Sequence, residues 1–151
     1  MQVSARAEYA LRAVSELAAV GGGPMKGNDI SEAQDISRKF LENILTELKH
    51  SGIIRTQRGA GGGYWLARSA SEITLAEVIR AVDGPLANVR GARPETVEYR
   101  GPAGSLQEVW IAVRANLRAV LESVTVEDLA NDRLPDAIKI LTRDPEAWVG
   151  H

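Results

Sequence analysis

The sequence predicts a mainly α-helical protein with one small β-hairpin. Over most of the chain, apolar residues recur at steps of three and four, which is typical of helices that bury one face. At 52–67, two short runs of β-branched and aromatic residues flank a block of glycines, which predicts a hairpin. We expect four parts: a head at 1–84, a long loop at 85–104, a dimerisation helix region at 105–130 and a tail at 131–151.

Composition is that of a folded soluble protein. The chain has 151 residues, 44% of them hydrophobic and 25% charged, which fits one domain or a small domain with an arm. No apolar run approaches the ~20 residues of a membrane span, and no charged-then-apolar leader begins the chain. We therefore expect a cytoplasmic protein without membrane contact. Cysteine is absent and the histidines are His50 and His151, so we expect no disulfide, no metal site and no cofactor.

Three helices are expected before the hairpin. Ser4 can cap the first, which runs to about Val20. A short second helix spans about 28–34, and a tight turn follows it. Ser37 is the expected N-cap of a third helix, which Gly52 ends. The core residues expected on this third helix are Phe40, Leu41, Ile44, Leu45 and Leu48.

The hairpin has an unusually long, glycine-rich connection at 58–63. Glycine lets a backbone approach another surface closely, and Arg58 beside it could reach a narrow, negative groove. Taken alone, the stretch favours an ordinary glycine-rich hairpin. The order of a short helix, a turn, a longer helix and a hairpin instead favours a winged helix-turn-helix, a DNA-binding arrangement.

Charge supports DNA contact at the third helix and hairpin. Residues 37–68 hold six basic and two acidic residues, a net charge of +4 in a chain whose net charge is −2. Arg and Lys can pair with guanine, Asn with adenine, and Glu can accept from cytosine. The alternative for these polar residues is a solvated helix face. The expected DNA-binding residues are Arg6, Ser37, Arg38, Lys39, Phe40, Glu42, Asn43, Arg58, Gly59 and Gly61.

Capping patterns predict the elements after the hairpin. Thr74-Leu75-Ala76-Glu77 opens a helix that ends at Gly84-Pro85. The loop at 85–104 is rich in Gly, Pro and Arg. Ser105-Leu106-Gln107-Glu108 then opens the longest helix, to about Val124, and the segment from Thr125 to Asp128 is a third cap. The tail is polar, with one expected short helix at 137–142.

The longest helix carries an apolar seam that favours a homodimer. A helix of ~30 Å is too long for a small head to cover, although packing onto its own domain is the alternative. The expected dimerisation residues are Leu106, Val109, Trp110, Val113, Leu117, Val120, Leu121 and Val124.

Sequence motifs for catalysis do not fit this chain. The glycine block lacks the sixth-position glycine of a dinucleotide fingerprint and the Gly-Lys-Ser/Thr ending of a Walker loop. No Ser/His/Asp set can be assembled around two peripheral histidines. We therefore expect a binding protein and not an enzyme.

The chain resembles the Rrf-two family of bacterial winged-helix regulators, of the IscR/NsrR/CymR type, over residues 1 to about 130. The matching motifs are Ser4-x-x-x-x-Tyr9-Ala10, Ile36-Ser37-x-x-Phe40-Leu41-Glu42, Arg58-Gly59-x-Gly61-Gly62-Gly63-Tyr64, Ile73-Thr74-Leu75-x-x-Val78-Ile79, Val82-Asp83-Gly84-Pro85 and Val124-Thr125-Val126-x-Asp128-Leu129.

The resemblance implies a homodimer that binds double-stranded DNA at a pseudo-palindrome, with one head at each half-site. It implies that Ser37, Lys39, Phe40, Glu42 and Asn43 read bases, and that Arg58 and Gly59 enter the minor groove. We expect a transcriptional regulator that acts as a repressor. The alternative is a winged-helix module that is regulated by, or recruits, a protein partner.

The sequence departs from the family at the loop 85–104. Many members hold an iron–sulfur cluster there with three cysteines, and this loop has none, so cluster-based sensing is not carried over. We expect instead that the former cluster site is a pocket for a small anionic or aromatic effector. Its expected residues are Glu8, Arg12, Arg90, Arg93, Tyr99 and Trp110. The alternative is that Glu8 and Arg12 pair with charged residues of the loop and hold it in place.

Overall fold

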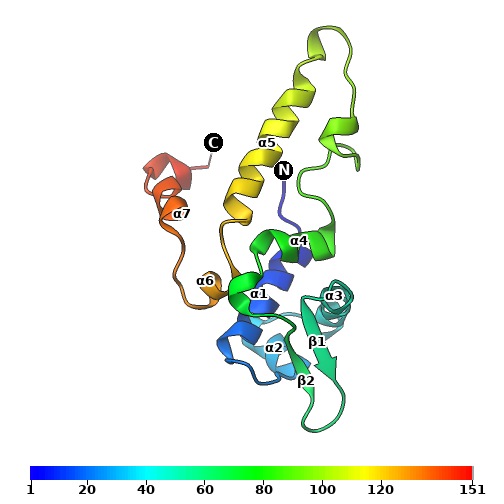
Figure 1. Ribbon diagram of the computed structural model, residues 1–151, viewed down its shortest axis with the longest axis vertical. Coiled ribbons are helices and arrows are strands. Elements are labelled where there is room, and N and C mark those ends of the chain that lie inside the picture. Colours follow the sequence, from blue (N-terminus) through cyan, green and yellow to red (C-terminus); the bar gives the residue numbers. More distant parts are fainter. Residues whose placement is uncertain (151) are drawn as a thin grey trace.

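A computed structural model describes residues 1–150 and shows a helical head, a hairpin at one end and a projecting helix at the other (Figure 1). The predicted mainly α-helical class with one β-hairpin is confirmed. The helices are α1 (Ala5–Ala19), α2 (Gly27–Gln34), α3 (Arg38–His50), α4 (Leu75–Asp83), α5 (Leu106–Leu121), α6 (Val126–Ala130) and α7 (Asp136–Leu141). The strands are β1 (Ile54–Gln57) and β2 (Gly63–Leu66), and four 3-10 turns lie at Ala70–Glu72, Pro94–Thr96, Gly101–Ala103 and Pro145–Trp148.

The core of the head is built around α1. Its buried face is made mostly of alanines, Ala7, Ala10 and Ala13, together with Val14 and Leu17. Because these side chains are small, α3, α4 and α6 can all pack closely against this one helix. The largest fully buried side chains of the other elements complete the core: Ile30, Leu41, Ile44, Leu45, Leu48, Ile54, Ile73, Val78 and Val126.

Two of the three predicted capping boxes are present. Thr74 with Glu77 and Thr125 with Asp128 each exchange side-chain and backbone hydrogen bonds at a helix start. The box expected at Ser105 is wrong, because Ser105 has helical backbone angles (φ −74°, ψ −6°) and its side chain caps nothing. A 3-10 turn just before it already starts the helical path, whereas an N-cap requires extended angles.

The structure also tests the other predicted helix ends, at Ser4, Ser37 and Gly52. Ser4 caps α1 by accepting a hydrogen bond of 2.9 Å from the Ala7 N–H, as expected. Ser37 is the N-cap residue of α3, as predicted, but its side chain makes no cap hydrogen bond. Gly52 ends α3 with φ +74°, and Ile53 donates a backbone hydrogen bond to the Leu48 carbonyl in the geometry of a Schellman motif.

The hairpin is joined to the helix-turn-helix by a contact that sequence patterns did not indicate. β1 and β2 are antiparallel, with Ile54 opposite Leu66 and Gln57 opposite Gly63. Met25, just before α2, exchanges two backbone hydrogen bonds of 2.9 Å with Tyr64 of β2. The hairpin therefore has a third extended segment beside β2, near the end of that strand that follows the glycine-rich connection, and this segment leads directly into α2.

The helix α5 leaves the head and the chain then returns to it. α5 ends at Leu121, and Val124 is 3% exposed, so its predicted place on the dimerisation face is wrong. The Val124 carbonyl accepts a hydrogen bond of 3.0 Å from the Leu75 N–H, and the Val126 N–H donates one of 2.9 Å to the Ile73 carbonyl. These bonds bring α6 onto α1 in the head, although we expected α6 in the dimerisation region.

The loop 85–104 and the tail are both more ordered than their composition suggests. The loop runs back beside α5, where the Gln107 side-chain amide lies within hydrogen-bond distance of the Pro94, Glu95 and Val97 carbonyls, at 3.3, 3.3 and 2.8 Å (Figure 1). The tail forms α7 close to the expected 137–142. Trp148 is 76% exposed, and its Nε1 donates to the Thr142 carbonyl at 2.7 Å.

Two neighbouring glycines of the hairpin connection should respond differently to substitution. An added Cβ at Gly62 would overlap the Gln57 carbonyl, whereas one at Gly61 would meet nothing within 4 Å. Gly62→Ala should therefore lower the free energy of unfolding by about 1–3 kcal/mol, because backbone atoms must shift. Gly61→Ala, the matched control, should leave it within about 0.5 kcal/mol. Thermal unfolding followed by circular dichroism measures both, and equal melting temperatures would contradict the assignment.

Candidate nucleic-acid interface

The helix α3 presents a polar face to solvent and an apolar face to the core. Leu41, Ile44, Leu45 and Leu48 are buried, at the spacing of one helix face. The other side of the first two turns is exposed and carries six of the expected DNA-binding residues, Ser37, Arg38, Lys39, Phe40, Glu42 and Asn43. The structure therefore brings these six residues onto one accessible surface.

Lys39 and Asn43 on this surface, and Arg58 on the hairpin, are polar side chains that no other residue within 1–150 holds. Among residues 1–150, none of the three makes a side-chain hydrogen bond or an ion pair. Lys39 and Asn43 lie four residues apart on α3, and Arg58 lies at the hairpin tip. Donors that are exposed and uncommitted can bind an external acceptor without first breaking an internal bond.

Arg38 and Glu42, by contrast, interact with each other. The Arg38 guanidinium lies 3.5 Å from a Glu42 carboxylate oxygen, an i,i+4 pair with both side chains exposed. The same guanidinium packs directly over the Gly27 backbone at the start of α2. An exposed pair of this kind contributes little to stability, so it can open when a ligand competes for either partner.

Arg6 has a structural position that its sequence did not indicate. Its guanidinium donates to the Val82 carbonyl at 2.8 Å and forms an ion pair with Glu47, so it ties α1 to α3 and α4. With Phe40, Asn43 and Ile44 it also lines a small hollow of about 150 Å³. Three of the expected DNA-binding residues therefore meet at one depression beside α3.

Phe40 does not lie in the core as its spacing predicted, because it is 43% exposed. Its ring packs edge-on against Tyr9, with ring centroids 5.7 Å apart at 84°. The Arg12 guanidinium lies 5.2 Å from the centroid of the Tyr9 ring. This row of Arg12, Tyr9 and Phe40 crosses from α1 to α3, and sequence spacing alone could not reveal it.

Contacts with neighbouring residues hold both the strands and the connection of the hairpin. Lys26 Nζ donates to the Gly59 carbonyl at 2.7 Å, and Arg55 stacks 4.9 Å from the centroid of the Trp65 ring on the paired strand. Gly59, with φ +102°, and Gly61 both have free space where a side chain would stand. The tip therefore offers exposed backbone and one uncommitted cation, Arg58.

The residues of the expected effector pocket make separate sets of contacts in the described residues 1–150. Arg12 pairs with Glu8 at 3.4 Å and donates to the Gln34 side chain at 3.0 Å, so neither residue contacts the loop 85–104. Trp110 donates from Nε1 to the Tyr99 hydroxyl at 3.0 Å, which joins α5 to the loop. Within residues 1–150, neither Glu8 nor Arg12 makes a hydrogen bond or ion pair with the loop, and the effector pocket stays a prediction.

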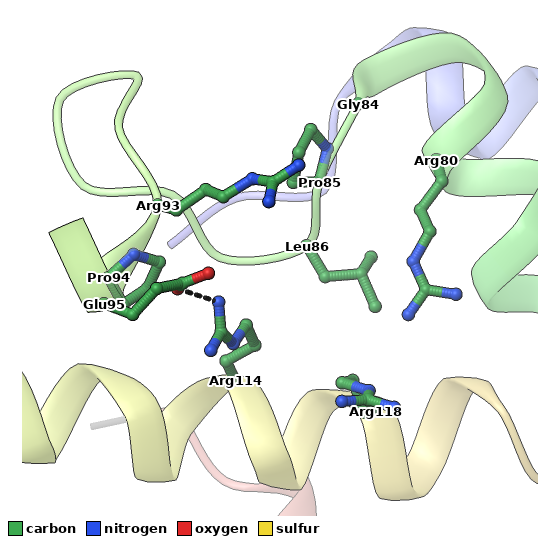
Figure 2. Close-up of a pocket in the computed structure, with 9 residues that line it drawn as sticks. All are labelled: Arg80, Gly84, Pro85, Leu86, Arg93, Pro94, Glu95, Arg114 and Arg118. Carbon is green, nitrogen blue, oxygen red and sulfur yellow. Dashed lines mark hydrogen bonds and ion pairs between the residues drawn. The ribbon is translucent and has the colours of Figure 1, made fainter.

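A different cavity lies between α4, the loop and α5 (Figure 2). It has a volume of about 480 Å³, and its lining includes Arg80, Arg93, Arg114 and Arg118. We call it the arginine cavity. Of the expected pocket residues it contains only Arg93. The spacing of Arg114 and Arg118, one helical turn apart, was the available sequence signal, but the position of α4 opposite them was not readable from sequence.

Two carboxylates are held by the arginines of this cavity. Glu122 accepts from Arg80 at 2.6 Å and from Arg118 at 3.0 Å, and these hydrogen bonds, the Arg80 one first, lower the pKa of its carboxyl. Glu95 pairs with Arg114. The pKa of Glu95 is also lowered, first by a hydrogen bond to its own backbone and then by the bond from Arg114.

The residues at the loop do not fit an iron–sulfur cluster. Such clusters are held by thiolates, with imidazole as an occasional substitute, and 85–104 contains neither cysteine nor histidine. Within residues 1–150, no three His, Cys, Asp or Glu side chains gather in a way that could hold a metal ion. None of the helices in that range is long and apolar enough to cross a membrane.

Acidification should weaken the link between α4 and α5. Because the folded-state pKa of Glu122 lies below the ordinary value of 4.5, its stabilising effect is present above that pH and is lost as the pH falls through the folded value. The melting temperature of the wild type should exceed that of Glu122→Gln at about pH 7, and the two should converge towards about pH 3. Glu98→Gln, at an exposed loop position, should show no such convergence. A constant difference across this pH range would contradict the role of the carboxylate.

Comparison with known proteins identifies the family. The Rrf2 family, described as "Iron-dependent Transcriptional regulator", matches residues 3–132. Rv1287 of Mycobacterium tuberculosis, provisionally described as an HTH-type transcriptional regulator, is 45% identical over 148 residues, or 97% of this chain and 92% of its own. The HTH-type transcriptional regulator CymR of Bacillus subtilis is 35% identical over 132 residues, or 87% of this chain and 91% of its own.

Solved structures agree. The structure of CymR from B. subtilis, described as the global cysteine regulator, has a TM-score of 0.73 at 34% identity and covers 87% of this chain and 97% of that one. IscR from T. potens has a TM-score of 0.71 at 29% identity, covering 91% and 90%. The chain therefore belongs to the Rrf2 (Rrf-two) family as a cysteine-free member, and it is a winged-helix, DNA-binding transcriptional regulator and not an enzyme.

Proposed function

We propose that the protein is a cytoplasmic, homodimeric repressor that binds a pseudo-palindromic operator through α3 and the hairpin. The observation that carries this proposal is that Lys39 and Asn43 on the exposed face of α3, and Arg58 at the hairpin tip, have no partner within residues 1–150. In the proposed complex the first turns of α3 enter a major groove, where Lys39 can bind guanine and Asn43 adenine. The hairpin tip lies over the neighbouring minor groove and inserts Arg58.

The apolar seam of α5 supports a dimer. None of its residues is buried by the rest of the chain, which is unusual for a 16-residue helix rich in Val and Leu. Val109 is 50% exposed, while Trp110, Val113, Leu117 and Val120 are only half-buried. Packing against the same helix of a second copy would cover this surface and place two heads at a fixed separation, as a two-fold DNA site requires.

A dimer that spans two half-sites would cover promoter DNA, and we infer repression because covered promoter DNA is not accessible for transcription. A signal would act by changing the angle between the heads. The seam continues into an apolar hollow of about 600 Å³ beside the N-terminus, lined in part by Val3, Ile79, Leu117 and Leu121. A second copy would therefore touch both α5 and the head, so that changes at the arm reach the DNA-binding surface.

Single substitutions at the proposed DNA contacts should weaken operator binding and leave folding intact. Lys39→Ala and Arg58→Ala should each cost about 1–3 kcal/mol of binding free energy where a base contact is lost, and a lost phosphate contact should reduce the salt slope by about 1. Fluorescence anisotropy on an operator, selected from bound genomic fragments, measures this over a salt series. Arg143→Ala in the exposed tail is the control. Unchanged affinity for both variants would remove the assigned roles.

A charge placed in the seam should separate the dimer. Val109→Glu buries a carboxylate in the proposed interface, whereas the exposed Ala115→Glu places the same charge on the opposite side of α5. Analytical ultracentrifugation should show a monomer for Val109→Glu and a dimer for both the wild type and Ala115→Glu. A monomeric wild type, or a dimeric Val109→Glu variant, would contradict this interface.

A further inference from the structure

We propose that the arginine cavity is a binding site for a compact metabolite dianion with phosphate or carboxylate oxygens, and that the dianion is the signal of this regulator. The part concerning the signal rests on the proposed function. Figure 2 shows Arg80 extending from α4 towards α5, Arg114 rising from α5 towards the loop, and Arg93 extending from the loop. Three separate elements thus direct guanidinium groups towards one cavity.

The charge of the site suits a dianion. The cavity has four guanidinium groups, those of Arg80, Arg93, Arg114 and Arg118. Arg80 and Arg118 pair with Glu122, and Arg114 pairs with Glu95, so the six groups together carry a net charge of +2. Guanidinium forks match the oxygen pairs of phosphate and carboxylate in a bidentate geometry. A ligand with two negative charges would therefore neutralise the cavity while finding several donors.

The size and the apolar part of the lining suit a small metabolite. The volume of about 480 Å³ lies within the range of pockets that take small organic ligands. Pro85, Leu86 and Pro94 add an apolar surface between the charged groups, and Leu86 and Pro94 are buried. Free inorganic anions need no such surface, whereas the carbon skeleton of a metabolite would pack against it.

Operator DNA is the competing source of anionic oxygens, and the fold separates it from this site. The hairpin and the arginine cavity lie at opposite ends of the head, because the cavity is formed where α4 meets the loop and α5 (Figure 1). A duplex held by α3 and the hairpin would leave the cavity open to small molecules.

The position of the cavity gives binding a consequence for regulation. Arg80 belongs to the head and Arg118 to α5, and at present Glu122 joins them. A dianion would compete with Glu122 and Glu95 for the same guanidinium groups. Occupancy would thus replace an internal link between head and arm by a ligand-mediated one, and so shift the angle between them.

Titration calorimetry with inorganic phosphate and with succinate, at matched ionic strength and without DNA, tests binding. Comparing the two probes shows whether the cavity prefers phosphate or carboxylate oxygens. We expect at least one probe to bind, Arg114→Gln to weaken it roughly tenfold or more, and Glu95→Gln to strengthen it. Both variants break the same ion pair between Arg114 and Glu95. Opposite changes in probe affinity would therefore identify an anion site, because simply losing the pair would change the affinity in the same direction in both variants. Arg100→Gln, in the loop but outside the cavity, is the control.

Operator anisotropy with and without the bound probe then tests the signal. In the wild type, the affinity of the dimer for its operator should change at least severalfold when the probe is added. In Arg114→Gln, the probe should leave this affinity unchanged. If neither probe binds better than chloride, or if Glu95→Gln and Arg114→Gln shift affinity in the same direction, the site is overturned. Probe binding without any change in operator affinity overturns the signalling role alone. Failure of operator binding in the absence of probe would instead overturn the proposed function, so the two failures are distinguishable.

Discussion

The paired backbone bonds between Ile73–Leu75 and Val124–Val126 hold the structure together at the point where the arm leaves the head. They join the start of α4 to the segment after α5. The chain from the loop to the end of α5 therefore leaves the head and returns to it at the same place. Two capping boxes stand side by side there, each of which fixes the direction of its helix. Because both ends of this part of the chain are anchored to the same place, α5 can project from the head and still keep a defined orientation.

This closure also explains why the seam of α5 stays uncovered in one chain. The head meets α5 chiefly near its last turns, through Glu122 and the segment that follows, while the loop covers another side through Gln107. An apolar surface of this extent in an otherwise well-packed protein is normally completed by another surface. The proposed dimer and the arginine cavity therefore use different sides of the same helix.

Local signals were sufficient for the elements but not for the sites that they form together. The caps at Thr74 and Thr125, the stop at Gly52 and the hairpin depend on residues close in sequence, and each was readable there. Val124 and Phe40 show where this fails, since helical spacing placed one on the arm and the other in the core, and long-range packing reversed both. The arginine cavity requires α4, the loop and α5 to meet, and no pattern within one of them fixes that meeting. Glu8 and Arg12 were expected at the loop, and they remain instead with α2 and with each other.

The bridge between Met25 and Tyr64 gives the head a further property. Since Tyr64 of β2 is bonded to the segment that leads into α2, and Lys26 holds Gly59 at the tip, the hairpin cannot swing independently of the helix-turn-helix. In the proposed complex, α3 and Arg58 are then held at a fixed distance from each other. Such a head binds best where the spacing between a major groove and the neighbouring minor groove matches this fixed distance. That spacing differs between stiff and flexible DNA sequences. Part of the operator's identity would then reside in base pairs that no side chain touches.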